Sequence, residues 1–76
     1  MTIMTLNELP LGYSGKVQEL HTYGPERRRM LDLGLIKNTP VQPLFQSPFG
    51  DPIAYLIRGT VIALRNEDAK KILIYI

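Results

Sequence analysis

The sequence lacks cysteine, and none of its apolar runs is longer than a strand. Without cysteine the chain has no disulfide, no thiolate metal site and no cysteine nucleophile, which suits a reducing cytoplasm. The apolar runs are too short to span a bilayer, and the segment Met1 to Leu6 lacks the basic head and long apolar run of a signal peptide. We therefore expect a cytoplasmic protein without redox chemistry.

Charge of either sign is also sparse. Nine lysines and arginines stand against seven acidic residues, and this net charge of +2 is a weak field for holding nucleic acid. The one basic cluster, Arg27 to Arg29, lies in a predicted helix, where successive side chains point about 100° apart and do not share one face. The length of 76 residues predicts a single domain over residues 1–76.

Two short helical segments are predicted. Pro25 suits the first turn of a helix and Gly34 suits its end, which predicts a helix over about Pro25 to Leu33. Asn66 is expected to cap a short helical turn over about Glu67 to Lys71, where acidic residues precede lysines and match the helix dipole.

The first helix carries an apolar stripe of Met30, Leu31 and Leu33. Residues at this spacing usually belong to the core, although a short helix on a barrel can expose one of them for docking, and Met30 is the candidate for that role. Arg28 and Asp32 are spaced to pair across one turn. Arg28 is therefore expected either on a solvated helix face or in a partner contact.

Five strands are predicted, three of them forming a meander. In the first strand Val17 and Leu20 fall on opposite faces, which indicates a bulge or burial on both sides. The last strand is apolar on both faces and has to be paired. Because no crossover is long enough for a parallel unit, the pattern favours a mostly β fold, a small and partly open barrel. The strands are Lys16 to Tyr23, Pro40 to Gln46, Pro52 to Ile57, Val61 to Arg65 and Ile72 to Ile76.

A proline-rich loop, Ser47 to Pro52, connects two of these strands. Gly50 allows a positive φ at its tip, and Asp51 can accept hydrogen bonds from nearby amides. Two prolines lower the entropy lost on ordering, so the loop is preorganised for binding. Two interpretations stay open: Phe49 is presented outward, or it folds over the barrel end as a lid.

Four segments carry a family resemblance: Leu9 to Gly12, Arg28 to Leu35, Ser47 to Ile53, and Arg58-Gly59 with Ala63-Leu64-Arg65. In this order and spacing they resemble the FeoA family of ferrous iron transport proteins, over nearly the whole chain. The resemblance implies an SH3-like barrel that assists the membrane iron transporter FeoB, which carries a GTPase domain. The chain departs from the family at Lys37 to Thr39, where proline and glycine are usual; since Asn38 tolerates left-handed backbone, we expect the turn to persist.

The chain offers little catalytic or metal-binding chemistry. No nucleophile, base and orienting group are recognisable together, and there is no phosphate-binding loop, so we expect neither an enzyme nor a cofactor. His21, the only histidine, can share a strand face with Glu19, and these two are weak candidates for metal ligands. The alternative is a solvated or hydrogen-bonded strand histidine.

We therefore expect a non-enzymatic accessory protein that docks on the cytoplasmic GTPase part of a FeoB-like transporter and reaches the inner face of the plasma membrane only through it. One alternative is a nucleic-acid-binding barrel with stacking tyrosines. Another is a stand-alone relative of the SH3-like domain of metal-dependent repressors, which the same barrel resembles. A homo-oligomer also stays open, because the terminal strand is apolar. The expected partner-binding residues are Arg28, Met30, Pro48, Phe49, Asp51 and Arg58.

Overall fold

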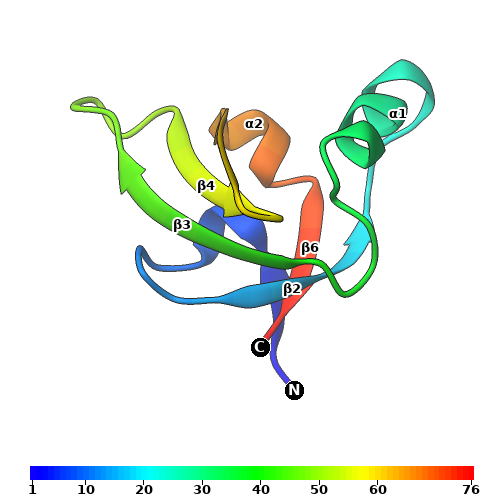
Figure 1. Ribbon diagram of the computed structural model, residues 1–76, viewed down its shortest axis with the longest axis horizontal. Coiled ribbons are helices and arrows are strands. Elements are labelled where there is room, and N and C mark those ends of the chain that lie inside the picture. The colour runs from blue at the N-terminus through cyan, green and yellow to red at the C-terminus, as the bar shows by residue number, and fades with distance from the viewer.

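The computed structural model describes residues 1–76 as one curled antiparallel sheet with short helices around it (Figure 1). The strand order is β1-β6-β2-β3-β4-β5. The predicted mostly β fold is confirmed, with six strands in place of five. The strands are β1 (Ile3–Thr5), β2 (Gly15–Leu20), β3 (Pro40–Gln46), β4 (Ile53–Ile57), β5 (Thr60–Leu64) and β6 (Ile72–Tyr75); the helices are the 3-10 turn η1 (Leu6–Glu8), α1 (Gly24–Asp32) and α2 (Asn66–Ala69).

The strand that the sequence did not reveal is β1. It pairs with β6 in a register that joins Ile3 to Tyr75 and Thr5 to Leu73. Three residues are too few to show an alternating pattern, and this strand depends on a partner from the other end of the chain. With β1 on one side and β2 on the other, the apolar β6 lies inside the sheet, paired along both edges as its composition requires.

Two register shifts in the sheet change the face on which the side chains that follow them lie. The register of β2 against β6 shifts between Val17 and Glu19, which confirms the predicted bulge and leaves Val17 and Leu20 both buried. A second shift, between Pro43 and Phe45 of β3, places Phe45 opposite Ala54 and turns it outward, where it is 60% exposed. The core that the sheet encloses consists of Leu6, Leu9, Val17, Leu20, Met30, Leu35, Val41, Tyr55, Ile57, Leu64, Ala69, Ile72 and Ile74.

Helix α1 begins one residue before the predicted Pro25 and is tied to the start of β6. Lys71 Nζ donates to Glu26 Oε1 at 3.0 Å, and this hydrogen bond raises the pKa of Lys71. The predicted pairing of Arg28 with Asp32 is wrong: the ion pairs of the structure are Glu26 with Lys71 and Glu19 with His21. Arg28 and Asp32 are both exposed, where an ion pair gains little over hydration.

The turn after α1 persists in the way that the sequence indicated. Asn38 has a φ of +74°, and its side-chain oxygen accepts a hydrogen bond from the Tyr75 hydroxyl at 2.5 Å. Asparagine therefore supplies both the left-handed backbone and a tie to β6. No helix of the structure is long and apolar enough to cross a membrane.

Candidate partner-binding surface

The proline-rich loop between β3 and β4 projects from the sheet at the upper left of Figure 1. The Ser47 amide donates to the Pro52 carbonyl at 3.1 Å, and the Gly50 amide donates to the Ser47 carbonyl at 2.8 Å, so the loop closes on itself. Gly50 has the predicted positive φ, +85°. Phe49 is 97% exposed, which rules out its interpretation as a lid over the barrel end. Pro48 beside it is also exposed.

Asp51 anchors this loop to helix α2. Its Oδ1 accepts from the Asn66 amide at 2.8 Å, so the predicted acceptor role of Asp51 is confirmed. The prediction that Asn66 caps the helix is wrong in its position: the N-cap residue is Arg65, and Asp51 reaches in from the loop to the first amide. The Asn66 side chain instead accepts from Asn7 Nδ2 at 3.1 Å, which joins α2 to η1.

Burial and charge around the loop also act on Tyr55. This residue of β4 is only 1% exposed, and its burial, together with the negative charge of Asp51, raises the pKa of its phenol to about 12. Tyr55 is therefore neutral at any physiological pH. Tyr55 belongs to the core and is not available for stacking.

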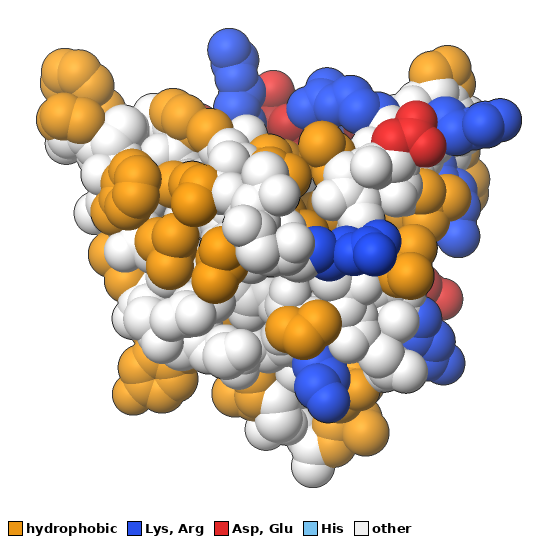
Figure 2. All heavy atoms as spheres, in the orientation of Figure 1, with side chains coloured by type: hydrophobic (Ala, Val, Ile, Leu, Met, Phe, Trp, Pro, Cys, Tyr) orange, Lys and Arg blue, Asp and Glu red, His pale blue; other side chains and the backbone are white.

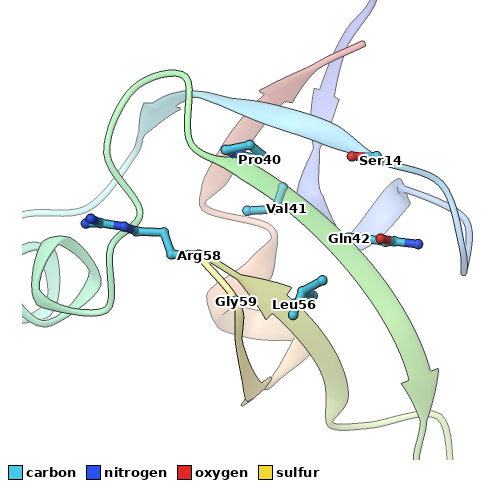
Figure 3. A pocket seen from close by; sticks show the side chains of 7 residues that line it. All are labelled: Ser14, Pro40, Val41, Gln42, Leu56, Arg58 and Gly59. Atoms are coloured by element: carbon cyan, nitrogen blue, oxygen red, sulfur yellow. The ribbon is translucent and has the colours of Figure 1, made fainter.

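Arg58 lies at the opposite end of β4, in the two-residue turn to β5. It has a φ of +51° and is followed by Gly59 at +80°, the left-handed pair that a tight hairpin of this type requires. The stem of Arg58 passes over Gly34, where an added Cβ would lie 2.5 Å from Arg58 Cδ. Figure 3 shows the guanidinium extending toward the segment after α1.

A shallow hollow of about 180 Å³ lies beside this turn (Figure 3). Its polar groups include Gln42, whose Nε2 already donates to the Gly12 carbonyl at 3.0 Å. The one charged side chain that lines the hollow is Arg58. It is lined by Ser14, Pro40, Val41, Gln42, Leu56, Arg58 and Gly59.

On α1 the structure separates the two predicted contacts. Arg28 is exposed and available to a partner. Met30 is not available, because it is only 3% exposed and receives a hydrogen bond from the Thr22 hydroxyl on its sulfur at 3.9 Å. The core interpretation of Met30 is the correct one, and the apolar residue that this helix exposes is Leu31, at 37%. The α1 stripe is turned so that the middle of its three residues faces outward.

The remaining candidates therefore form two groups and not one surface. Pro48, Phe49 and Asp51 belong to the loop at one end of β4, whereas Arg58 lies at the other end of β4, with its stem over Gly34 just after α1. Five strand residues separate the two ends, about 17 Å.

An apolar patch that the sequence did not reveal lies between these ends. Figure 2 shows apolar side chains gathered over β3 and β4. Phe45 and Val61 are 60% and 54% exposed, and Leu56 is half-buried on the same outer face. Side chains of a regular strand alternate between the two faces, so Phe45 was expected on the inner face with Val41 and Pro43. The bulge between Pro43 and Phe45 turns Phe45 to the outer face. A proline followed by two apolar residues was the one available signal for that bulge.

His21 and Glu19 come together as predicted, at 2.7 Å between Nε2 and Oε2, with both side chains more than half exposed. No group of three or more histidine, aspartate or glutamate side chains gathers anywhere in the chain. Two exposed ligands are too few to hold a metal ion against water. The two side chains form a hydrogen-bonded pair on the surface.

A curled sheet with a projecting loop, a basic turn and an exposed apolar patch defines a small β-barrel domain of the SH3-like kind. The chain belongs to the FeoA family: the family model for the FeoA domain matches residues 4–76. This confirms the resemblance seen in the sequence, and with it the expectation of a non-catalytic accessory protein with an SH3-like fold.

Three relatives illustrate the similarity. The FeoA-like protein of Clostridium acetobutylicum is 34% identical with a TM-score of 0.89, covering 100% of this chain and 90% of that one. FeoA of Stenotrophomonas maltophilia, an SH3-domain protein solved with zinc, is 32% identical with a TM-score of 0.83, covering 93% and 88%. A Fe(2+) transport protein A/FeoB fusion protein of Porphyromonas gingivalis is 32% identical over 69 residues, which are 91% of this chain and only 8% of that relative's length.

The structure also resembles a manganese-dependent transcriptional repressor, with a TM-score of 0.84 over 97% of this chain at 19% identity. At this identity the likeness shows the fold alone. It explains why the same sequence pattern resembles both groups of proteins, since the barrel is common to them.

Proposed function

We propose that this protein is a cytoplasmic accessory of ferrous iron uptake that docks on the cytoplasmic GTPase part of a FeoB-like transporter, at the inner face of the plasma membrane. The observation that carries the proposal is the Porphyromonas gingivalis relative, in which a segment similar to this chain and FeoB belong to one polypeptide. Fusion of two modules supports association between their separate counterparts, because a covalent link only raises the local concentration of partners that already fit.

The exposed loop supports the same proposal. Phe49 is an aromatic side chain at 97% exposure on a loop held by two internal hydrogen bonds and by the bond from Asp51 to α2. Burying such a side chain in a partner's pocket gains apolar contact at little cost in loop entropy. Arg28 and Arg58, both exposed and outside any ion pair, add attraction to an acidic surface.

Regulation of the transporter then follows from binding alone. The chain has no phosphate-binding loop, so it acts on nucleotide turnover only by binding one state of the GTPase more tightly than another. The size of any change in turnover is limited by that difference in affinity. Measuring GTP hydrolysis by the transporter with and without this protein gives the sign of the effect.

Calorimetric titration of the isolated cytoplasmic part of the transporter with this protein tests the proposal. We expect Phe49→Ala to weaken binding about tenfold or more, since an aromatic anchor contributes roughly 2 kcal/mol or more. Tyr13→Ala is the matched control, because Tyr13 is an exposed aromatic residue outside the candidate set, at 62%. Equal affinity of the Phe49→Ala variant and the parent protein would remove the loop from the interface.

A further inference from the structure

Strand β5 is an open edge of the sheet. It stands last in the strand order and pairs only with β4. None of the backbone hydrogen bonds outside the helices and strands involves any residue of Thr60–Leu64. The side of β5 that faces away from β4 therefore carries backbone donors and acceptors without a partner in the chain.

The hairpin geometry identifies these groups. In a two-residue hairpin the residues that flank the turn, here Ile57 and Thr60, form a hydrogen-bonded pair, and bonded pairs then alternate along the strands. The backbone groups of Thr60, Ile62 and Leu64 consequently point to β4. Those of Val61 and Ala63 point to the open edge, which presents two amides and two carbonyls in line.

This edge has none of the features by which proteins prevent edge strands from pairing. Such features are charged side chains, proline, bulges and short length. The sequence of β5 is Thr-Val-Ile-Ala-Leu, without charge or proline, and its five register pairs with β4 run without a shift. The other edge strand, β1, has only three residues. An edge strand that is regular and lacks these protective features favours pairing with a further strand.

A groove opens next to Thr60 and Ile62 of β5. It has a volume of about 380 Å³ and lies between β5 and the end of α1. Leu33 and Ile62, both half-buried, are among its apolar lining residues, and Asp32 lies on its α1 side. A strand added at this edge would therefore cover apolar surface as well as pair with backbone groups.

The charges at the two ends of β5 indicate which kind of segment would pair with this edge. Arg58 and Arg65 flank β5 at its two ends, are exposed, and form no ion pair. If a second copy of the chain paired through β5, the bonded pairs Val61 with Ala63 would centre on Ile62, and Arg58 and Arg65 of one copy would lie opposite Asn66 and Gly59 of the other. A second copy would therefore place no acidic side chain opposite either arginine. An extended segment with acidic residues at both ends, by contrast, would meet an arginine at each end.

We propose that the β5 edge binds an extended segment of a partner protein, apolar in its middle and acidic at its ends, as an added strand of the sheet. This inference rests on the proposed function in one respect: the transporter's cytoplasmic part is the natural source of the segment. The mode is β-strand addition, in which backbone hydrogen bonds supply affinity and alternate side chains supply selection.

Amide hydrogen exchange followed by NMR tests the proposal directly. Two probes are used: the cytoplasmic part of the FeoB-like transporter, and an acetylated seven-residue peptide of alternating valine and threonine flanked by aspartates. We expect either probe to slow exchange of the Val61 and Ala63 amides about tenfold or more, because these are the amides that the added strand would cover. The peptide with lysines in place of the aspartates is the control and is expected to bind more weakly.

Two pairs of variants sharpen the test. Ala63→Pro removes an outward amide but no hydrogen bond to β4, and Ala63→Ser keeps that amide. We expect binding to weaken about tenfold or more in Ala63→Pro and to persist in Ala63→Ser. Arg65→Glu is expected to weaken binding of the aspartate peptide, while Lys70→Glu, which makes the same change of charge at the exposed C-cap residue of α2, is expected to weaken it less.

The outcomes separate this inference from the proposed function. Binding of the transporter part without protection of Val61 and Ala63 overturns the inference and leaves the docking proposal standing. If the peptide protects Val61 and Ala63 but the transporter part does not bind, the inference stands and the docking proposal is overturned. Failure of both probes to bind contradicts both. A concentration-dependent dimer that Ala63→Pro abolishes would show that a second copy occupies the edge, and would also overturn the inference.

Discussion

At the residue scale, two glycines with similar backbone angles differ in what surrounds them. Gly34 and Gly50 have φ values of +97° and +85°. An alanine at either position is strained by the left-handed backbone, at a cost of about 1–2 kcal/mol. Only at Gly34 would the added Cβ also meet another residue, Arg58 Cδ at 2.5 Å, whereas nothing lies within 4 Å at Gly50.

We therefore expect Gly34→Ala to lower the free energy of unfolding more than Gly50→Ala, by about 1 kcal/mol or more. Urea denaturation of the two variants gives this difference, and Gly50→Ala is the control for backbone strain. The same loss in both variants would show that the Arg58 stem moves aside freely. In that case the packing of Arg58 over the end of α1 would not orient its guanidinium.

Tyr55 gives the protein an expected weakness at high pH. Its pKa is about 12 in the folded protein against 10.0 for an ordinary tyrosine. A raised folded pKa means that the unfolded chain loses its phenol proton first, so the contribution of Tyr55 to stability is constant below pH 10 and falls as the pH rises from 10 to 12. The loss from this residue is on the order of 2 kcal/mol. Alkaline unfolding followed by circular dichroism measures it.

Tyr55→Phe removes this titration and is the comparison that isolates it. The variant is expected to be less sensitive than the parent protein between pH 10 and pH 12. If the two curves run in parallel over this range, the alkaline loss comes from other groups, such as Lys71, whose pKa is also raised through its bond to Glu26.

At the element scale, the proline-rich loop and helix α2 form one unit. A helix of four residues gains little from its own hydrogen bonds, and its first amides need an acceptor. Asp51 supplies that acceptor from the loop at 2.8 Å from the Asn66 amide. The loop that presents Phe49 is consequently anchored on the body of the protein through α2.

Asp51→Ala is expected to destabilise the protein by about 1 kcal/mol through loss of this cap, and Asp51→Asn by less, because asparagine keeps an oxygen acceptor. Thermal denaturation of both variants measures the difference. If Asp51→Asn folds normally but fails to bind the transporter part, the charge of Asp51 contributes to docking; if both variants are as stable as the parent protein, the bond to Asn66 contributes nothing.

The elements also show where sequence reasoning succeeds. The start and end of α1, the Gly50 turn and the bulge near Val17 follow from local rules about proline, glycine and alternation, and each is confirmed. Met30 and Phe45 do not follow from such rules. Which member of the α1 stripe faces the core depends on how the helix sits on the barrel, and the outward turn of Phe45 depends on a register shift against β4.

At the scale of the whole molecule, the charges are dispersed. Figure 2 shows lysines and arginines spread over the visible face without a continuous basic patch. The exposed tyrosines Tyr13 and Tyr23 lie before β2 and before α1, and the other two tyrosines are buried or half-buried. This arrangement does not form the basic groove with aromatic platforms that binds single strands.

We therefore expect no tight binding of single-stranded or duplex DNA in a fluorescence titration at low salt. Any residual binding should be weak and should show only a shallow dependence on salt, because few phosphates would be neutralised. Tight binding with a steep salt dependence would revive the nucleic-acid alternative and would count against a function limited to a protein partner.

The sequence by itself determined the fold class, the family and the presence of a rigid loop with Gly50 and Asp51 in their roles, because these depend on local backbone preferences and on motif order. Only the tertiary structure decided that Phe49 is exposed, that Met30 is buried, and that β5 is left open at the edge of the sheet. Whether a side chain is exposed and whether a strand lies at the edge of the sheet both depend on how segments far apart in the sequence pack together. Strand β1 pairs with β6, so β5 has no neighbour on the side that faces away from β4. Rules about adjacent residues do not predict which distant strands pair.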